Sequence, residues 1–559
     1  MINPINHYAL ENHPTIYDEE SLTALELVAR TTHKLNEVIK EVNGFVGATP
    51  EKIKTDVDEW MKAHPEAYTT VMDKSLGSSK FLPGALGYVT PEMFGAVGDG
   101  VTDDTQAIKD MFAFGLHNYL FDGHYLLTDN VTVPGNSVLQ SNNATFTQDV
   151  FGKGIFTTTG SNIRFIGTFN FVQTREKVKL DVEGVECSAL LLSGPASNIT
   201  IDIFNIKSFI GGLVFGGYDH QNIKANRIHV ENCDFGVWGA NVHTFSLDTL
   251  SFKNVDNSQL EPAHALYLTS NDREIKSTDV YIRNVIGTGC IVGDADAVLS
   301  IKATSGFYCD NLDVKNVNVA FTAANSSGYI KNPKADGVHN YVFMIQGSSP
   351  DGRPFQVLDG DFCNLDCEWY AYGVGAYGFG VVERCQFSGT SAKGFVYMSD
   401  LVGLEERDCV FVNTGATSLK CYNIASGDPA TLYNPTIKGM GLVQFINSGV
   451  NVHFYINPEK LNDLCNQVTY HTIYLENEYF VELTAIDSNN LYNNIIAVDA
   501  GIIKLRGNGV FTLINKNHSS HIIDNGTGSL VLKNGANQYT KDEWTAKMFR
   551  VINNVAYEI

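Results

Sequence analysis

The middle of the chain consists of short segments in which apolar and polar residues alternate, separated by turns rich in Asn and Gly. Such alternation is typical of half-buried β-strands. Five of these segments, IDIFN, IHVEN, LSFKN, VYIRN and LDVKN, end on Asn205, Asn232, Asn254, Asn284 and Asn316. The steps between these asparagines are 27, 22, 30 and 32 residues, and a period of about 20–25 residues suits one coil of a stacked solenoid. We therefore predict stacked β-coils with asparagines in left-handed turns and extra loops in the two longest steps.

A second periodic feature is a cysteine placed two residues before a phenylalanine, in VENCDF, VERCQF and ERDCVF. Residues two apart on a strand share one face. Cys363 precedes Cys385 by 22 residues, and Cys409 follows Cys385 by 24. Because these distances again match one coil, we predict that the three cysteines stack in one inward-facing column. An unrelated β-sandwich with chance spacing is the alternative, which two ladders of similar period disfavour.

The most specific motif is residues 92–108, EMFGAVGDGVTDDTQAI. Its glycines favour tight turns with positive φ, and Asp103 or Asp104 can cap a helix predicted over 105–115 and oppose its positive end. This segment resembles the entrance of the pectate-lyase-like right-handed β-helix superfamily, in which a short helix caps the first rung. The resemblance implies an all-β protein built on a right-handed parallel β-helix. It implies no particular chemistry, because lyases, hydrolases and adhesins share the fold.

Changes in composition and rhythm divide the chain into four predicted parts. Apolar positions along Ser21–Asn43 form the seam of a helix, and Glu51–Ala63 is a second, shorter helix candidate. A Gly/Ser/Pro-rich neck follows, and strands joined by Asn and Gly continue with a different rhythm after the coils. The predicted parts are a helical segment (1–73), a neck with the capping segment (74–116), the β-helix (117–465) and a C-terminal β-rich domain (466–559).

This order of parts resembles a bacteriophage tailspike or tail-appendage protein. The resemblance implies attachment to a phage tail or baseplate through residues 1–90, a place in the virion tail, and recognition of a glycan on the host cell surface. It also implies a homotrimer. Association is favoured physically because a β-helix exposes strand edges at its ends and the seam of Ser21–Asn43 packs most easily against copies of itself. The sequence alone does not choose three copies over two.

Composition narrows the set of partners. The 559-residue chain carries a net charge of −23, which argues against nucleic acid and against anionic membrane surfaces as partners. It has no run of about 18 apolar residues that would predict membrane insertion, and its N-terminus lacks the basic and apolar regions of a secretory signal. The ten cysteines are scattered without metal-ligand spacing. We therefore expect buried thiols made in a reducing cytoplasm, and neither a metal nor a cofactor.

Cleavage of a glycosidic bond normally requires two carboxyl groups about 5–10 Å apart. Side chains two apart on a strand, or on neighbouring coils, give such a separation. The densest grouping of carboxylates with basic partners lies between residues 254 and 316, in the two longest coil steps. The expected acid/base pairs are Asp294 with Asp296 and, as second choice, Asp272 with Glu274. The residues expected to orient the sugar are His264, Tyr267 and Lys302.

Each candidate also has a structural alternative. Asp294 and Asp296 lie in GDADA, which is equally a turn sequence, His264 fits a stacked turn histidine, and Lys302 fits an exposed strand lysine. A further stretch, EWYAYGVGAYGFG, contains Trp369 and Tyr370 as substrate-binding candidates. Exposed aromatic side chains stack on sugar rings, whereas strand alternation would bury about half of the aromatics in this stretch.

These features favour a tailspike depolymerase that cleaves a bacterial surface polysaccharide or teichoic acid by carboxylate acid/base hydrolysis. The main alternative is a non-catalytic tail adhesin that binds the same glycans through several copies. A polysaccharide lyase is less favoured, because it requires a uronate substrate and a basic residue near a charge-neutralising group. A cellular pectinase-like enzyme is disfavoured by the helical N-terminus and by the missing secretory signal.

Overall fold

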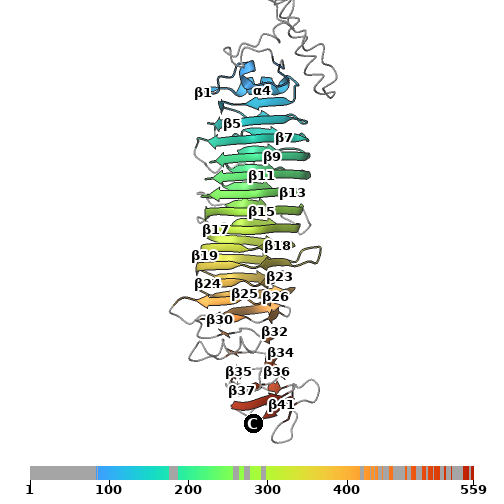
Figure 1. Ribbon diagram of the computed structural model, residues 1–559, viewed down its shortest axis with the longest axis vertical. Helices are drawn as coiled ribbons and strands as arrows, with labels where there is room; N and C mark the ends of the chain where they lie inside the picture. The colour runs from blue at the N-terminus through green and yellow to red at the C-terminus, as the bar shows by residue number, and fades with distance from the viewer. Residues whose placement is uncertain are drawn as a thin grey trace, which may run out of the picture.

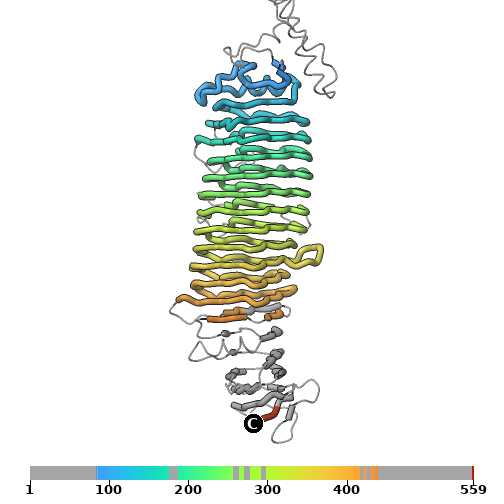
Figure 2. Tube along the Cα trace, viewed as in Figure 1, coloured from blue at the N-terminus to red at the C-terminus, as the bar shows by residue number. Residues whose placement is uncertain are grey.

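A computed structural model describes residues 83–438 apart from 85, 151, 176–186, 256–262, 270–276, 291–296, 416–420, 428–429 and 434, and beyond residue 438 the strands given below and the terminal residue. The described residues form an all-β stack of coils with an α-helix at its N-terminal end (Figure 1). Figure 2 shows the coils following one another along a single axis. The predicted helical segment 1–73 lies outside the described residues.

The coils build three faces of parallel strands, here called A, B and C. One strand, β17 (Thr304–Ala324), crosses all three. Its first part pairs with β18 (Gly328–Lys331) on face B, its middle with the start of β19 (Pro333–Gln346) on face C, and its end with β16 (Ala297–Lys302) on face A. The pairings of β17 with these three strands are all parallel. The predicted parallel β-helix is therefore confirmed.

Face A consists of short strands together with the ends of β17 and β19. Its short strands are β6 (Phe156–Thr158), β8 (Ser188–Leu192), β10 (Gly211–Phe215), β12 (Phe235–Gly239), β14 (His264–Leu268), β16, β22 (Tyr370–Gly375), β25 (Gly394–Leu401) and β28 (Tyr422–Gly427). The long strands that pass from face B to face C are β5 (Val138–Gln148), β7 (Ile163–Gln173), β9 (Ala196–Lys207), β11 (His220–Glu231), β13 (Val242–Lys253) and β15 (Ser277–Cys290).

In the later coils, faces B and C have separate strands. Those of face B are β18, β20 (Phe355–Leu358), β23 (Phe379–Glu383), β26 (Gly403–Arg407), β29 (Ala430–Tyr433), β32 (Val452–Ile456), β34 (Phe480–Ala485), β36 (Gly501–Gly507) and β38 (His521–Ile523). Those of face C are β21 (Asp361–Cys367), β24 (Gln386–Ser391), β27 (Val410–Asn413) and β30 (Thr436–Lys438).

The parallel ladder of face B continues past residue 465, through β34 and β36 to β38. A separate five-stranded sheet contains antiparallel pairs, β37 with β40 and β40 with β41. The remaining C-terminal strands are β31 (Val443–Gln444), β33 (Ile473–Tyr474), β35 (Asn494–Val498), β37 (Gly509–Asn515), β39 (Leu530–Val531), β40 (Ala546–Ile552) and β41 (Val555–Glu558). The C-terminal part is β-rich, as expected, and the domain boundaries stay predictions.

The entrance motif forms the N-terminal cap of the coils. Its elements are the 3-10 helix η3 (Pro91–Phe94), β1 (Asp99–Asp103), α4 (Thr105–Ala113), β2 (Asn118–Phe121), β3 (His124–Leu127) and β4 (Val131–Thr132). The predicted helix is thus confirmed, and Ile108, Met111 and Phe112 pack its apolar side into the core. Neither of the described helices has the length and apolar character needed to cross a membrane.

The two aspartates before α4 have different roles. Asp103 accepts a hydrogen bond at Oδ1 from the Thr105 N–H at 3.0 Å, as a cap would. Asp104 is the N-cap residue, but its side chain makes no cap bond. Its carboxylate instead accepts the N–H groups of Val97 at 2.7 Å and Gly98 at 3.1 Å. Asp104 therefore fastens the preceding glycine turn to the start of the helix.

The predicted cysteine column is correct for two of its three members. Cys385 and Cys409 are buried and lie side by side in the paired coils. The prediction is wrong for Cys363, because Gly360 occupies the position beside Cys385. The Gly360 N–H donates to Cys385 Sγ at 3.4 Å. The coil measures 25 residues at this point. Cys363 precedes Cys385 by only 22 residues and so lies three positions out of register with it. The side chain of Cys363 is only half-buried.

The predicted asparagine ladder proves to be two ladders. Asn232, Asn254 and Asn316 have φ of 53°, 52° and 52°, the expected left-handed conformation, although Asn316 adopts it within β17. Asn205 and Asn284 lie inside β9 and β15 without a positive φ, so the turn assignment is wrong for them. Asn205 Nδ2 donates to an asparagine Oδ1 of the preceding coil at 2.8 Å. Asparagine therefore stacks both in turns and along strands, which a count of spacings does not distinguish.

Candidate functional site

Face A presents one column of side chains at equivalent positions of successive coils. The register aligns Trp238, Tyr267, Ser300, Thr322, Met344, Gly373 and Tyr397. Neighbouring strands lie about 4.8 Å apart, so Tyr267 and Tyr397, five strands apart, are separated by about 24 Å. Aromatic residues therefore stand toward both ends of this column, with smaller or more flexible side chains between them.

The upper aromatic cluster consists of Phe235, Trp238, His264, Tyr267 and Lys302. The Tyr267 ring centroid lies 4.7 Å from that of His264 and 5.5 Å from that of Phe235, and the Phe235 and Trp238 centroids are 4.7 Å apart. Lys302 Nζ lies 5.0 Å from the Tyr267 centroid and donates a hydrogen bond to Tyr267 Oη at 3.2 Å. The structure thus brings together the three residues that were expected to orient the sugar.

His264 is the buried member of the upper aromatic cluster, with 4% of its surface exposed. Its Nδ1 lies 2.7 Å from the carbonyl oxygen of Ala297 and 3.3 Å from the Ala297 nitrogen. The shorter contact is the better hydrogen bond, so Nδ1 carries the proton. Burial lowers the pKa of His264 to about 4, and the ring is neutral near pH 7. His264 thus supports the Tyr267 ring, while Tyr267 and Lys302 are the more accessible groups.

The lower aromatic cluster consists of Trp369, Tyr370, Lys393, Tyr397 and Asn423. Trp369 is 51% exposed in the turn before β22, and Lys393 Nζ lies 3.3 Å from the centroid of its ring. Tyr370 is only 7% exposed. Its ring stacks on Tyr397 at 4.9 Å, and its Oη accepts a hydrogen bond from Asn423 Nδ2 at 2.7 Å. Trp369 therefore offers an accessible ring, whereas Tyr370 is a packing residue.

The four predicted catalytic carboxylates lie outside the described residues. Asp272 and Glu274 belong to the segment between β14 and β15, and Asp294 and Asp296 to the segment between β15 and β16. The described ends of both segments border the upper aromatic cluster, because β14 and β16 carry its histidine, tyrosine and lysine. Both pairs stay predictions. Within the described residues, no group of three or more His, Cys, Asp or Glu side chains is arranged to hold a metal ion.

One carboxyl group with an unusual environment was not predicted. Glu406 of β26 is fully buried inside the coils. It accepts hydrogen bonds from Tyr372 Oη and, at 2.6 Å, from Tyr422 Oη. Burial raises the pKa of Glu406 to about 7. The sequence signal for the burial of Glu406 is the alternation of β26, in which Leu404 and Glu406 share one face. A carboxyl group enclosed by the core is out of reach of a glycan.

Phe235, Trp238 and Lys393 were not predicted either. Phe235 and Lys393 each contact a residue one coil away in sequence, and Trp238 is aligned with Tyr267 of the next coil, so these neighbours depend on the register between coils. The sequence signal for them is the aromatic content of β12 and the lysine in the turn before β25. Neither signal stands out before the register is known.

No protein-family model matches the chain. The pre-neck appendage proteins of Bacillus phages PZA and phi29 are each 25% identical to it over 272 residues, which cover 41% of this chain and 30% of theirs. A capsule K30/K69-specific depolymerase of Klebsiella phage K64-1 is 44% identical over 61 residues, 10% of this chain and 8% of the depolymerase. The chain thus matches less than a third of the length of these curated relatives.

Two solved structures align with most of the chain. An N-terminal fragment of bacteriophage phi29 gene product 12 covers 74% of this chain and 87% of its own length, with 10% identity and a TM-score of 0.34. The A-module of the Azotobacter vinelandii mannuronan C-5 epimerase AlgE6 covers 74% and 98%, with 11% identity and a TM-score of 0.32. With its parallel β-helix and these sequence matches, the chain resembles a bacteriophage tail-appendage or tailspike protein.

Proposed function

We propose that this chain is a tail-appendage subunit that binds a bacterial surface polysaccharide or teichoic acid along face A and cleaves it by acid/base hydrolysis. The observation that supports the binding most directly is the presence of two aromatic clusters on one face. Aromatic rings stack on the apolar faces of sugars. Since the clusters lie several strand spacings of about 4.8 Å apart, they suit an extended chain of several sugar units.

In this proposal, Tyr267 and Trp369 stack on sugar rings at the two ends of the site. Lys302, held against Tyr267, donates hydrogen bonds to hydroxyl or carboxylate oxygens of the glycan. Of Asp294 and Asp296, one acts as the general acid and the other as the base or nucleophile. The protonated carboxyl group gives its proton to the leaving glycosidic oxygen, and the ionised one activates water or attacks the sugar carbon.

A specific observation favours a second candidate, a non-catalytic adhesin. The strands β14, β16 and β22 and the face A ends of β17 and β19 carry no Asp or Glu. An adhesin would use the same two aromatic clusters, and several copies of the chain would add affinity without any cleavage. A lyase acting on a uronate is the third outcome that the cleavage experiment below distinguishes.

The same proposal places the protein in the virion tail. Residues 1–90 attach it to a phage tail or baseplate, and three copies associate. The similarity to phage appendage proteins supports this arrangement, as do the strand edges that a parallel β-helix leaves at its ends.

Glycan binding is tested with variants of the two accessible rings. Tyr267→Ala and Trp369→Ala in the full chain should each weaken binding to purified host envelope glycans by about tenfold, since a stacking contact is lost. Tyr267→Phe keeps the ring and should lose less. Tyr281→Ala, on face B, is the control. Equal affinities of the two alanine variants and the wild type in a glycan pull-down or calorimetric titration would refute binding along face A.

Cleavage is tested by incubating the purified protein with host envelope glycans and following both reducing ends and the absorbance of unsaturated uronate. Reducing ends alone indicate a hydrolase, both signals a lyase, and neither, with binding retained, an adhesin. Asp294→Asn and Asp296→Asn should lower the hydrolysis rate by about 10²–10⁴ while leaving binding largely intact. Unchanged rates in both variants would show that the acid and base lie elsewhere.

A further inference from the structure

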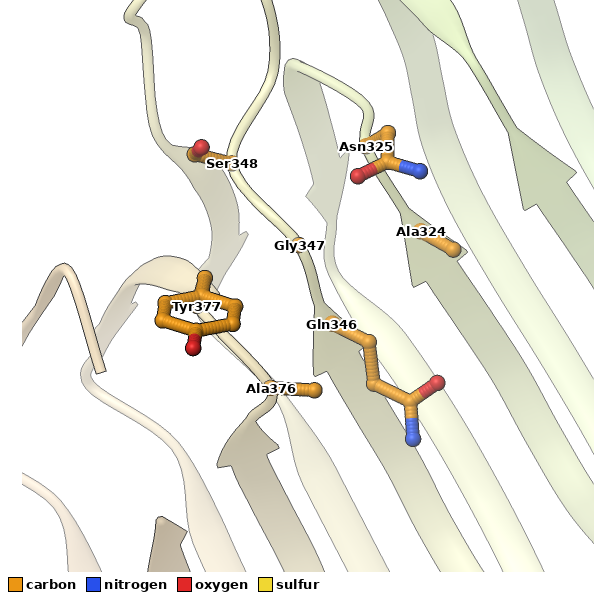
Figure 3. Close-up of a pocket in the computed structure, with 7 residues that line it drawn as sticks. All are labelled: Ala324, Asn325, Gln346, Gly347, Ser348, Ala376 and Tyr377. Atoms are coloured by element: carbon orange, nitrogen blue, oxygen red, sulfur yellow. The ribbon is translucent and has the colours of Figure 1, made fainter. Parts of the chain in front are cut away.

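A hollow of about 220 Å³ lies where the chain turns from face A to face B. It begins one coil beyond Lys302 of the upper aromatic cluster, because Lys302 is in register with Ala324. Figure 3 shows that its walls come from three consecutive coils, with the ring of Tyr377 on one side and the amide of Gln346 on another. Asn325 and Ser348 also line it. None of the lining side chains carries a charge near pH 7.

The hollow exists because one turn is longer than its neighbours. The turn after β19 has eight residues (347–354), whereas the turns after β17 and β22 have three each (325–327 and 376–378). The longer turn starts at Gly347, whose φ is +66° and where an added Cβ would lie 2.0 Å from Asn325 Oδ1. The Asn325 amide therefore lies directly against the Gly347 backbone.

The long turn is fastened to the preceding coils through Asp351. Its Oδ2 accepts hydrogen bonds from the hydroxyls of Ser305 and Ser327 at 2.6 Å each and from Arg353 Nη2 at 2.7 Å. Burial by itself would raise the pKa of Asp351, but these hydrogen bonds hold it well below its usual range. Because the carboxylate stays ionised and bonded, the wall of the hollow is held in place before any ligand arrives.

The opposite wall is held in an unusual backbone conformation. Ala376 and Tyr377 are consecutive non-glycine residues with φ of +47° and +69°, a region that side chains with a Cβ disfavour. Their N–H groups donate to the carbonyls of Ser399 at 3.0 Å and Asp400 at 2.5 Å. This backbone presents the Tyr377 ring with 59% of its surface exposed. A left-handed residue recurs at this turn in the preceding coils, at Ala303, Asn325 and Gly347, and Tyr377 adds a second one to it.

We propose that this cavity, the Tyr377 hollow, binds one neutral pyranose unit of a surface glycan as a second site at the edge of face A, which contributes Ala324 and Gln346. The ring of Tyr377 stacks on the sugar, and the amides of Asn325 and Gln346 and the hydroxyl of Ser348 bond its hydroxyls. The hollow is smaller than the roughly 300–1,000 Å³ of drug-sized ligand pockets, which suits a single sugar ring. The choice of a glycan as ligand rests on the proposed function.

The charge around the hollow argues for a neutral sugar. Its lining is uncharged, and the flanking turns contribute the carboxylates of Asp351 and Asp400. Arg353, the cation of the long turn, is bonded to Asp351. A uronate or a phosphate would therefore find no cation among the residues that line the hollow, and Lys302, which is in register with Ala324 in the neighbouring coil, is bonded to Tyr267.

The test measures monosaccharide binding to the full chain by saturation-transfer NMR. The probes are the methyl pyranosides of glucose, galactose, mannose and N-acetylglucosamine, with methyl glucuronide as the anionic comparison. At least one neutral glycoside should bind, Tyr377→Ala should weaken that binding at least about tenfold, and Tyr377→Phe should retain it within about threefold because the ring is kept. Tyr218→Ala is the matched control, since Tyr218 is 50% exposed in the corresponding turn between β10 and β11 and should change nothing.

Three results would overturn the proposal: no neutral glycoside binds, methyl glucuronide binds more tightly than all of them, or Tyr377→Ala binds as the wild type does. If Tyr377→Ala fails to fold, Gln346→Met decides instead. It keeps the length of the side chain, removes the amide and should weaken binding by about threefold to tenfold. Monosaccharide binding needs no cleavage, so this test and the cleavage test on face A can fail independently.

Discussion

Glu406 and Asp351 are carboxyl groups of one chain whose pKa values shift in opposite directions. Glu406 lies in the core, where burial outweighs the hydrogen bonds from its two tyrosines and the pKa rises to about 7. Asp351 is held by two hydroxyls and an arginine, which outweigh its burial. His264 loses its charge for the same reason that Glu406 does, because burial lowers its pKa to about 4. At this scale the environment, rather than the residue type, decides which groups carry charge.

Glu406 should make the stability of the coils depend on pH. Its pKa rises from 4.5 to about 7 on folding, so the folded chain holds a proton that the unfolded chain releases. The contribution of Glu406 to the free energy of unfolding should therefore be highest below pH 4.5 and fall by about 3 kcal/mol as the pH rises to 7. Denaturant unfolding of the wild type and of Glu406→Gln at pH 5, 6, 7 and 8 measures this, and the variant should lack that fall.

Glu405→Gln is the control, because Glu405 lies on the same strand and forms an ion pair with Arg407 at the surface. It should keep the wild-type pH dependence. Parallel curves for the wild type and Glu406→Gln would show that Glu406 is not the group that titrates.

At the scale of elements, side-chain hydrogen bonds join neighbouring coils to one another and stabilise the N-terminal cap. Asn162, Asn198 and Asn222 each donate their amide to the asparagine of the coil before, at 2.8, 3.0 and 2.6 Å. All three occupy left-handed turns, so one column of turns is tied together along the stack. The cap before the first coil depends in the same way on Asp104, which fastens a glycine turn to α4.

Removing this fastening should loosen the cap. Asp104→Ala deletes two hydrogen bonds to a buried carboxylate and should lower the free energy of local opening of β1 and α4 by about 1.5–3 kcal/mol. Hydrogen exchange followed by mass spectrometry on the peptides of residues 96–113 measures this opening. Asp99→Ala, which removes exposed turn bonds, should change exchange much less. Faster exchange in Asp99→Ala than in Asp104→Ala would contradict this role.

At the scale of the whole molecule, aromatic side chains stack in two columns inside the solenoid. Phe321, Phe343 and Tyr372 stack on one face at 4.8 Å per step, and Phe362, Phe387 and Phe411 stack on another at 4.9 and 5.3 Å. Each coil is thus stabilised by its neighbours, and only the two ends lack a partner coil.

The chain should assemble as a homotrimer. Strand edges at the ends of the coils and the predicted apolar seam of Ser21–Asn43 both gain burial when copies associate. Light scattering of the full chain at micromolar concentration should give a mass near three times 61.4 kDa. A mass near that of one chain would refute assembly, and a mass of two chains would refute the trimer alone.

Features that depend on neighbouring residues could be read directly from the sequence. The entrance helix was predicted with its first residue, Thr105, because its turn glycines and aspartates act within a few residues. The approximate coil period followed from recurring strands for the same reason. Cys363 was misplaced because a coil of 25 residues separates the true partners, and the length of each coil depends on its turns. Stacking between coils therefore resisted prediction where insertions changed that length.

The aromatic stretch after Glu368 shows where sequence reasoning ends. Its composition by itself predicted rings that either stack on sugars or pack in the core. The structure exposes Trp369 and Tyr377, which lie in turns, and buries Tyr370 and Tyr372, which lie in β22. The sequence by itself determined that this chain winds into parallel coils with a capped entrance, because these features depend on local turns and alternation. Only the tertiary structure decided which residues share face A or the Tyr377 hollow, because residues some 20–35 apart become neighbours only through the register of stacked coils.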